Sequence, residues 1–259
     1  MRILAVALLL AAAPGLAAQV DAEAKKKRLA EIVKQMGELH LEGEKLLNEL
    51  SGGDPDRKQA ILRETMEKHA PKMAAEAGRS QIASNERNAS STLTTLASAE
   101  ADFRANDRDA NNLIDFWVAD VSALYRIVAD EAIKLIEVSV AHADAKPCVP
   151  LEKEGKAPGA GKDSSKLIAL GKPSTKAGYW FAAVENFQDT TGATVKYDPG
   201  NGRNNSKFGF CTYPAEHGKT GKFTFILNEK NTVWKKDTGG QPVSVYPADP
   251  AKDGWSKLD

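Results

Sequence analysis

The chain has 259 residues with 35 basic and 35 acidic side chains, so its formal net charge at pH 7 is zero. A neutral chain gives no electrostatic reason to expect a nucleic acid or an acidic surface as its partner. Its length is sufficient for one or two domains, each with its own core.

The first 18 residues have the pattern of a secretory signal peptide. Arg2 gives a positive start, residues 3–13 are apolar, and small residues follow at 15–18. A membrane anchor needs about 20 apolar residues, whereas Pro14 and Gln19 interrupt this run too early. We therefore expect cleavage near residue 18, no membrane span after cleavage, and export to the periplasm, the cell envelope or the medium.

Residues 19–78 are predicted to form a helical hairpin. The first helix carries an apolar stripe with alternating three- and four-residue spacing: Leu29, Ile32, Met36, Leu39, Gly43, Leu46 and Leu50. Gly52 and Gly53 end it, and Asp54 followed by Pro55 starts the second, because Asp caps free amides and Pro suits the first turn. Pro71 ends or kinks the second helix. The stripe needs a mate, so we expect these helices to bind a protein partner or another copy of the chain, as in a coiled coil.

Residues 79–145 are expected to form two helices that flank an acidic loop. The first runs from about Gln81 to Arg104 with a thin, Ala-rich inner stripe: Ala89, Leu93, Leu96, Ala97, Glu100 and Phe103. After the loop, apolar residues between Trp117 and Val140 predict a further helical stretch in the core, which includes Val128.

The acidic loop has the spacing of a calcium site. Positions one, three, five and nine of a calcium-binding loop carry oxygen-bearing side chains: Asp107, Asp109, Asn111 and Asp115. The loop departs from the pattern at Asn112, where Gly is usual, and at Val118, where the closing carboxylate is missing unless Asp120 replaces it. The alternative is a solvated turn whose Asp and Asn side chains cap the next helix. We predict calcium here, as a structural clip.

The last two segments differ sharply in composition. Residues 146–177 are rich in Pro, Gly and Lys and predict a long loop or linker. Residues 178–259 contain aromatic and β-branched runs at 179–184, 208–213 and 223–227, and a turn at 228–231 leads into 232–234, which predicts a small antiparallel sheet. Cys148 and Cys211 are the only cysteines. In an exported protein they predict one disulfide; two buried free thiols are the alternative.

Residues 88–103 (NASSTLTTLASAEADF) resemble the exposed half of the long helix in bacterial type IV pilins and type II secretion pseudopilins. Residues 178–181, 208–214 and 221–233 look like the sheet of such a domain, especially in secreted pilin-like proteins of unassigned function. The resemblance covers about 79–259 and implies a helix packed on an antiparallel sheet; some major pseudopilins also bind calcium in an acidic loop. The family's hydrophobic N-terminal helix is absent, and a subunit without it cannot anchor in the membrane or pack into a pilus core.

Enzyme signatures are poor. His40, His69, His142 and His217 are scattered without metal-ligand spacing, and the sequence has no nucleophile elbow or phosphate-binding Gly loop. We predict an α+β protein: a helical hairpin, then a pilin-like domain with a helix packed on a small antiparallel sheet. The expected function is that of an exported, non-enzymatic structural or interaction protein. The alternatives are a secreted enzyme or enzyme accessory subunit, and an unanchored component of a type II secretion or type IV pilus-like system.

Overall fold

The computed structural model describes residues 14–127, 133–161 and 166–258, and the chain divides into two compact units, Met1–Ala75 and Glu76–Asp259. Most of the expected signal peptide therefore lies outside the described residues. Within these ranges, none of the helices combines the length and the apolarity that a bilayer span requires. The described part is mixed α and β with small antiparallel sheets, as the sequence predicts.

The first unit contains two helices, α2 (Pro14–Ser51) and α3 (Pro55–His69). The predicted start of α3 is confirmed, because Asp54 Oδ1 accepts hydrogen bonds from the backbone N–H groups of Asp56 at 2.9 Å and Arg57 at 3.2 Å. Lys58 Nζ joins the two helices through a 2.6 Å ion pair with Glu44 Oε2. The break at Pro71 is also confirmed, since α3 ends at His69 and the next helix begins at Pro71.

The long helix α4 (Pro71–Ala105) supplies one wall of the core of the second unit. Its predicted inner stripe is confirmed, because all six members are buried: Ala89, Leu93, Leu96, Ala97, Glu100 and Phe103. Two polar side chains fasten α4 to the turn between neighbouring strands. Asn85 Nδ2 donates to Thr220 O at 2.8 Å, and Glu86 Oε1 accepts from Lys222 N at 2.9 Å.

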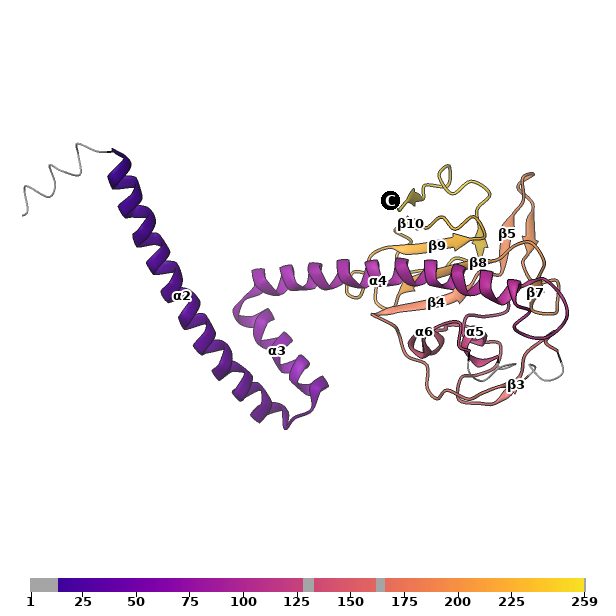
Figure 1. Cartoon of the computed structure of the whole chain (residues 1–259), viewed down its shortest axis with the longest axis horizontal. Coiled ribbons are helices and arrows are strands. Elements are labelled where there is room, and N and C mark those ends of the chain that lie inside the picture. The colour runs from indigo at the N-terminus through magenta and orange to yellow at the C-terminus, as the bar shows by residue number, and fades with distance from the viewer. Residues whose placement is uncertain (1–13, 128–132, 162–165, 259) are drawn as a thin grey trace, which may run out of the picture. The chain divides into compact units, whose positions relative to one another are not determined.

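The main sheet has five antiparallel strands in the spatial order β12 (Ser256–Lys257), β10 (Trp234–Lys236), β9 (Thr224–Asn228), β8 (Gly209–Pro214) and β4 (Tyr179–Ala183). The order follows the chain, so this sheet is a meander, and Figure 1 shows α4 running along β4 and β9. Ala182 pairs with Cys211, and Cys211 pairs with Ile226. All five residues of β9 are buried, so this strand lies in the core between its neighbours.

Three smaller sheets are built from the connections. The hairpin β5 (Asn186–Gln188) and β6 (Thr194–Lys196) extends from the end of β4, and β11 (Val245–Tyr246) adds to β5 in parallel. β2 (Gly155–Lys156) pairs with β3 (Lys166–Leu167), and β1 (Phe116–Trp117) pairs with β7 (Arg203–Asn204). The last of these pairs positions the candidate site.

The prediction of a long helix after the acidic loop is wrong. In its place lie β1, the four-residue helix α5 (Ala123–Arg126) and the five-residue helix α6 (Val138–His142); Val128 is outside the described residues. Buried carboxylates take the amides that a longer helix would use. Asp120 Oδ1 accepts from Ala123 N at 3.1 Å, and Asp144 Oδ2 accepts from Ser122 N at 2.7 Å. The core prediction is confirmed for Trp117, Val121, Leu124, Ile136 and Val140, which are buried, but it is wrong for Ile133 and Val138, which are 39% and 43% exposed.

The described residues of 146–177 are mostly loop, as predicted, although they include β2 and β3, and they are not a linker. Leu151 and Leu167 are fully buried, so the segment packs against the rest of the unit. The buried Arg126 guanidinium fixes it by donating to four backbone carbonyls at 2.6–3.3 Å: Val149, Pro150, Lys153 and Ile168. Arg126, in the preceding segment, thus fixes a loop whose Pro-, Gly- and Lys-rich composition by itself predicts a flexible linker.

Candidate functional site

The acidic loop is a tight turn that follows the end of α4. Asp107, Ala110 and Asn112 have left-handed backbone angles, with φ of 46°, 49° and 63°. Asp and Asn tolerate this region better than other non-glycine residues. The Asp107 carboxylate holds the turn, because Oδ1 accepts from Asn111 N at 3.0 Å and Oδ2 accepts from Asn112 N at 2.9 Å. Asp107 thus caps the backbone of its own loop.

The buried Arg203 guanidinium lies at the centre of the loop. Arg203 faces Trp117 across the β1–β7 pair and is 2% exposed. Its Nε donates to Asp109 Oδ2 at 2.7 Å, and its Nη2 donates to the same oxygen. Arg203 Nε also lies 3.9 Å from Asp115 Oδ1. Two of the four predicted metal ligands therefore face a cation that belongs to the protein.

Asn111 links these two carboxylates. Its Nδ2 donates to Asp109 Oδ2 at 3.0 Å and to Asp115 Oδ2 at 3.4 Å. Its Oδ1 accepts from Leu113 N at 2.7 Å. The four predicted site residues thus form one local network, in which Asp107 and Asn111 shape the backbone while Asp109 and Asp115 face the arginine.

Aromatic rings enclose the guanidinium. Arg203 Cζ lies 4.0 Å from the centre of the Trp117 ring and 5.5 Å from that of Phe103. A cation against a ring face is attracted by the ring quadrupole, and more strongly when both are out of water. Asp109, which binds this guanidinium, is itself fully buried.

Glu100 adds a third carboxyl group to this buried region. It lies on α4 with no exposed surface, and its Oε2 accepts from Trp117 N at 3.0 Å. Burial raises the pKa of Glu100 well above its usual range, although the Trp117 amide and the charge of Arg203 act in the opposite direction. Burial also raises the pKa of Asp109 and of Asp115, and it lowers that of Arg203, which stays a cation.

These donors fit a guanidinium better than calcium. Both Asp107 oxygens accept backbone N–H groups, and Asp109 Oδ2 already accepts from Arg203 and from Asn111. Across the described ranges, no group of three or more His, Cys, Asp or Glu side chains is arranged to hold a metal ion. Asp120 does not complete the loop either, because its carboxylate accepts from the Trp117 indole, Ala123 N and Cys148 N. Calcium at this loop stays a prediction.

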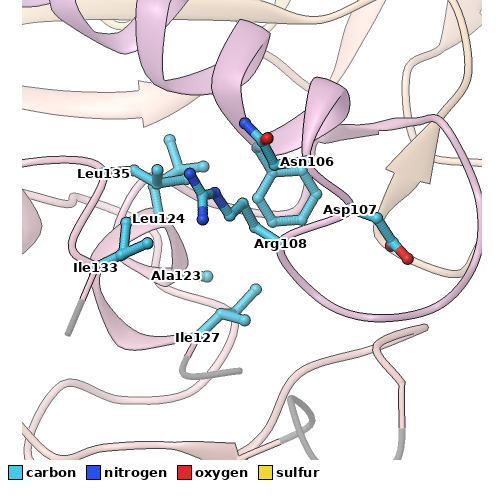
Figure 2. Close-up of a pocket in the computed structure, with 9 residues that line it drawn as sticks. Asn106, Asp107, Arg108, Ala123, Leu124, Ile127, Ile133 and Leu135 are labelled. Carbon is cyan, nitrogen blue, oxygen red and sulfur yellow. The ribbon is translucent and has the colours of Figure 1, made fainter. Parts of the chain in front are cut away.

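Two cavities adjoin the loop. One of about 170 Å³ is mainly apolar, and Figure 2 shows Arg108 extending toward Leu124 and Leu135 while Asp107 points away. Arg108 is held there by Asp102, whose carboxylate oxygens lie 2.6 and 3.2 Å from Nε and Nη2. The other, of about 350 Å³, is lined by Leu113, Ile114, Asp115, Pro199, Asn201, Arg203, Asn204 and Asn205. Neither set of lining residues includes a histidine, serine or cysteine that would act as a nucleophile or base.

A second buried charge cluster lies beside the first. Asp120 and Asp144 are fully buried, and burial next to Asp120 raises the pKa of Asp144 to about 7. Asp144 Oδ2 accepts from Val121 N and Ser122 N, and its Oδ1 accepts from Lys146 N. With Arg126, these carboxylates join the segment after β1 to the segment after α6. Their role in the structure is to hold backbone.

The two cysteines and two of the four histidines, His142 and His217, lie in the second unit and are far apart in its sequence. Cys148 is exposed and Cys211 is buried in β8, and both are free thiols in the structure. The expected pair is therefore not formed here, and the disulfide stays a prediction for the exported protein. Burial raises the pKa of Cys211 to about 11, so this thiol is protonated. His217 Nε2 lies 2.9 Å from Asp237 Oδ1, and His142 Nδ1 lies 3.0 Å from Lys172 O.

Sequence reasoning missed Arg203. It lies in the stretch 198–205, whose polar, Gly- and Asn-rich composition indicates a loop, and its carboxylate partner is 94 residues away. Asp198 Oδ1 shapes this stretch by accepting from the backbone N–H groups of Gly200, Asn201 and Gly202. The one available signal was the surplus of acidic residues at 107–115, which needs a cation from elsewhere in the chain.

Comparison with known protein families gives a match over most of the chain. The family described as "Protein of unknown function (DUF2950)" matches residues 65–249. This range includes the acidic loop, β1, β7 and four of the five strands of the main sheet, and it leaves α2 outside. No curated protein and no solved structure matches the chain.

Proposed function

The chain belongs to the DUF2950 family, and we propose that it is an exported, non-enzymatic structural protein whose second unit is a pilin-like module and whose N-terminal helices bind a protein. The observation that carries the proposal is the uncovered apolar face of α2. Export rests on the signal-like pattern of residues 1–18.

The apolar face of α2 is defined here as Leu29, Ile32, Leu39, Leu46 and Leu50. These residues are 60%, 44%, 67%, 50% and 59% exposed. Their three- and four-residue spacing places them along one side of the helix. Isolated exposed leucines are ordinary, but a continuous row on one helix is typical of an association surface. A protein that covers this row removes its apolar area from water.

The second unit supports a structural role. Its buried ion pair, Arg203 with Asp109, lies against Trp117 and Phe103 and holds the acidic loop. A long helix with a buried stripe lies on an antiparallel meander, which is the arrangement that the pilin resemblance implies. We therefore assign the globular unit to a scaffold that presents loops, and the binding to α2.

Site-specific photo-crosslinking in the source cells tests this proposal. A photoreactive amino acid replaces Leu39, which lies on the apolar face, and in a matched control it replaces Lys45, which lies on another side of the same helix. We expect a protein adduct from position 39 and a much weaker one from position 45. Failure to form any protein adduct at position 39, in cells that contain the folded chain, would refute the assigned binding role of α2.

A further inference from the structure

The chemistry of α2 also identifies its partner. Building on the proposed function, we infer that the apolar face of α2 is covered by the same face of a second copy of this chain, and that the two helices run antiparallel. Three features of the helix carry this inference: the side that α3 leaves free, the distribution of charge along the helix, and the register in which like faces fit.

The intrachain partner α3 does not cover the apolar face. Lys58 of α3 contacts Glu44 and Asn48 at 2.6 and 3.1 Å, and Ser51 at the end of α2 is buried. Leu46 and Leu50 lie within a turn of these residues and remain half exposed. The hairpin thus uses one side of α2 and leaves the heptad-spaced side open.

The charge of α2 reverses along its length. Residues 25–35 carry five basic side chains and one acidic side chain, a net charge of +4; residues 36–50 carry four acidic side chains and one basic side chain, a net charge of −3. Two parallel copies would align like with like. Two antiparallel copies place each basic half against an acidic half, which favours that orientation and disfavours the other.

A single antiparallel register satisfies both the apolar and the charged positions. It places Leu29 opposite Leu46 of the second copy and Ile32 opposite Gly43. A side-chain carbon added at Gly43 would have no atom within 4 Å in the single chain, so this position has room for the larger residue. In this register Arg28 of each copy lies beside the apolar layers, opposite Glu49 of the other copy. The apolar layers from residue 29 to residue 46 extend over about 26 Å of helix.

A charge-swap cycle on the full mature chain tests the orientation. Light scattering and sedimentation over a concentration series give the dimer dissociation constant of the wild type, Arg28→Glu, Glu49→Arg and the double variant. Each single variant replaces two attractive pairs per dimer by two repulsive ones, so we expect each to weaken dimerisation by about 5- to 30-fold. The double variant restores opposite charges and should return to within about twofold of the wild type.

Lys34→Glu is the matched control, because it makes the same charge change on the outer side of α2 and should leave dimerisation within about threefold of the wild type. A dimer that the double variant does not rescue refutes the antiparallel register and leaves the binding role of α2 intact. A chain that is monomeric at all concentrations, or an adduct at position 39 whose mass is not twice that of the chain, refutes self-association. Only the absence of any adduct refutes the proposed function as well.

Discussion

Replacing Arg203 by methionine is the most direct test of the buried loop. Methionine keeps much of the side-chain volume between Trp117 and Phe103 but removes the charge that Asp109 faces. Asp109 then has to take up a proton to stay buried. With an ordinary pKa of 3.8, this costs about 4 kcal/mol at pH 7, at 1.36 kcal/mol for each pH unit. Loss of one partner of a buried ion pair typically costs about 3–5 kcal/mol, so we expect a similar loss.

Urea unfolding followed by tryptophan fluorescence measures this effect. All four tryptophans lie in the second unit, at 117, 180, 234 and 255, so the signal reports the unit that contains the substitution. The sign of the pH dependence follows from Asp109. Its pKa in the folded variant is raised above that of the unfolded chain, so the folded state binds more protons and the variant loses stability as pH rises. Between pH 7 and pH 5 the deficit should shrink by about 2–3 kcal/mol.

Two further variants sharpen the test. Asp109→Asn combined with Arg203→Met removes both charges, and it should recover about 2–3 kcal/mol relative to Arg203→Met and lose most of the pH dependence. Lys219→Met breaks an exposed pair with Glu216 in the same unit, and it should leave the unfolding midpoint unchanged. An Arg203→Met protein as stable as the wild type at pH 7, or a deficit that is the same at pH 5, would show that the pair does not hold the loop.

Three other predictions concern the same unit. Glu100→Gln should raise the free energy of unfolding more at pH 7 than near pH 4.5, because burial raises the pKa of Glu100 in the folded chain above that in the unfolded chain; an equal gain at both pH values would contradict this. If Arg203 is the cation of the acidic loop, millimolar calcium should give no binding heat and no shift in Tm in calorimetry, whereas a clear shift would support the calcium site expected from the sequence. If Cys148 and Cys211 form a disulfide after export, reduction should raise the intact mass by two hydrogens; alkylation of both thiols without reductant would exclude it.

The sequence predicts those parts of the fold that depend on neighbouring residues. The cap at Asp54, the buried stripe of α4 and the strands β4, β8 and β9 each leave a local pattern of spacing or composition. The prediction of a helix over 117–140 was wrong because two carboxylates take backbone amides there: Asp120 caps Ala123 three residues on, and Asp144 reaches Ser122 from 22 residues away. Arg203 leaves no local pattern at all, because its position depends on the pairing of two-residue strands.

The candidate site was predictable only in part, because its loop has a local sequence pattern and its arginine does not. Acidic spacing identified the loop of Asp107 to Asp115 as a place for a positive charge, and the structure brings the four predicted residues into one network. The loop sequence does not show whether that positive charge comes from a metal ion or from a side chain. A guanidinium supplied by β7 and a metal ion impose the same requirement on the loop sequence, so only the tertiary contact distinguishes them.

The separation between Asp109 and Arg203 has a consequence for the order in which the chain folds. Arg203 follows Asp109 by 94 residues, so the Asp109 carboxylate cannot form its buried ion pair until most of the second unit has been synthesised. Trp117 contacts both buried clusters, since its ring lies on Arg203 and its indole N–H donates to Asp120 at 2.9 Å. We therefore expect the acidic turn to be a late element of folding, so that amides of residues 107–127 become protected from hydrogen exchange only when β7 pairs with β1.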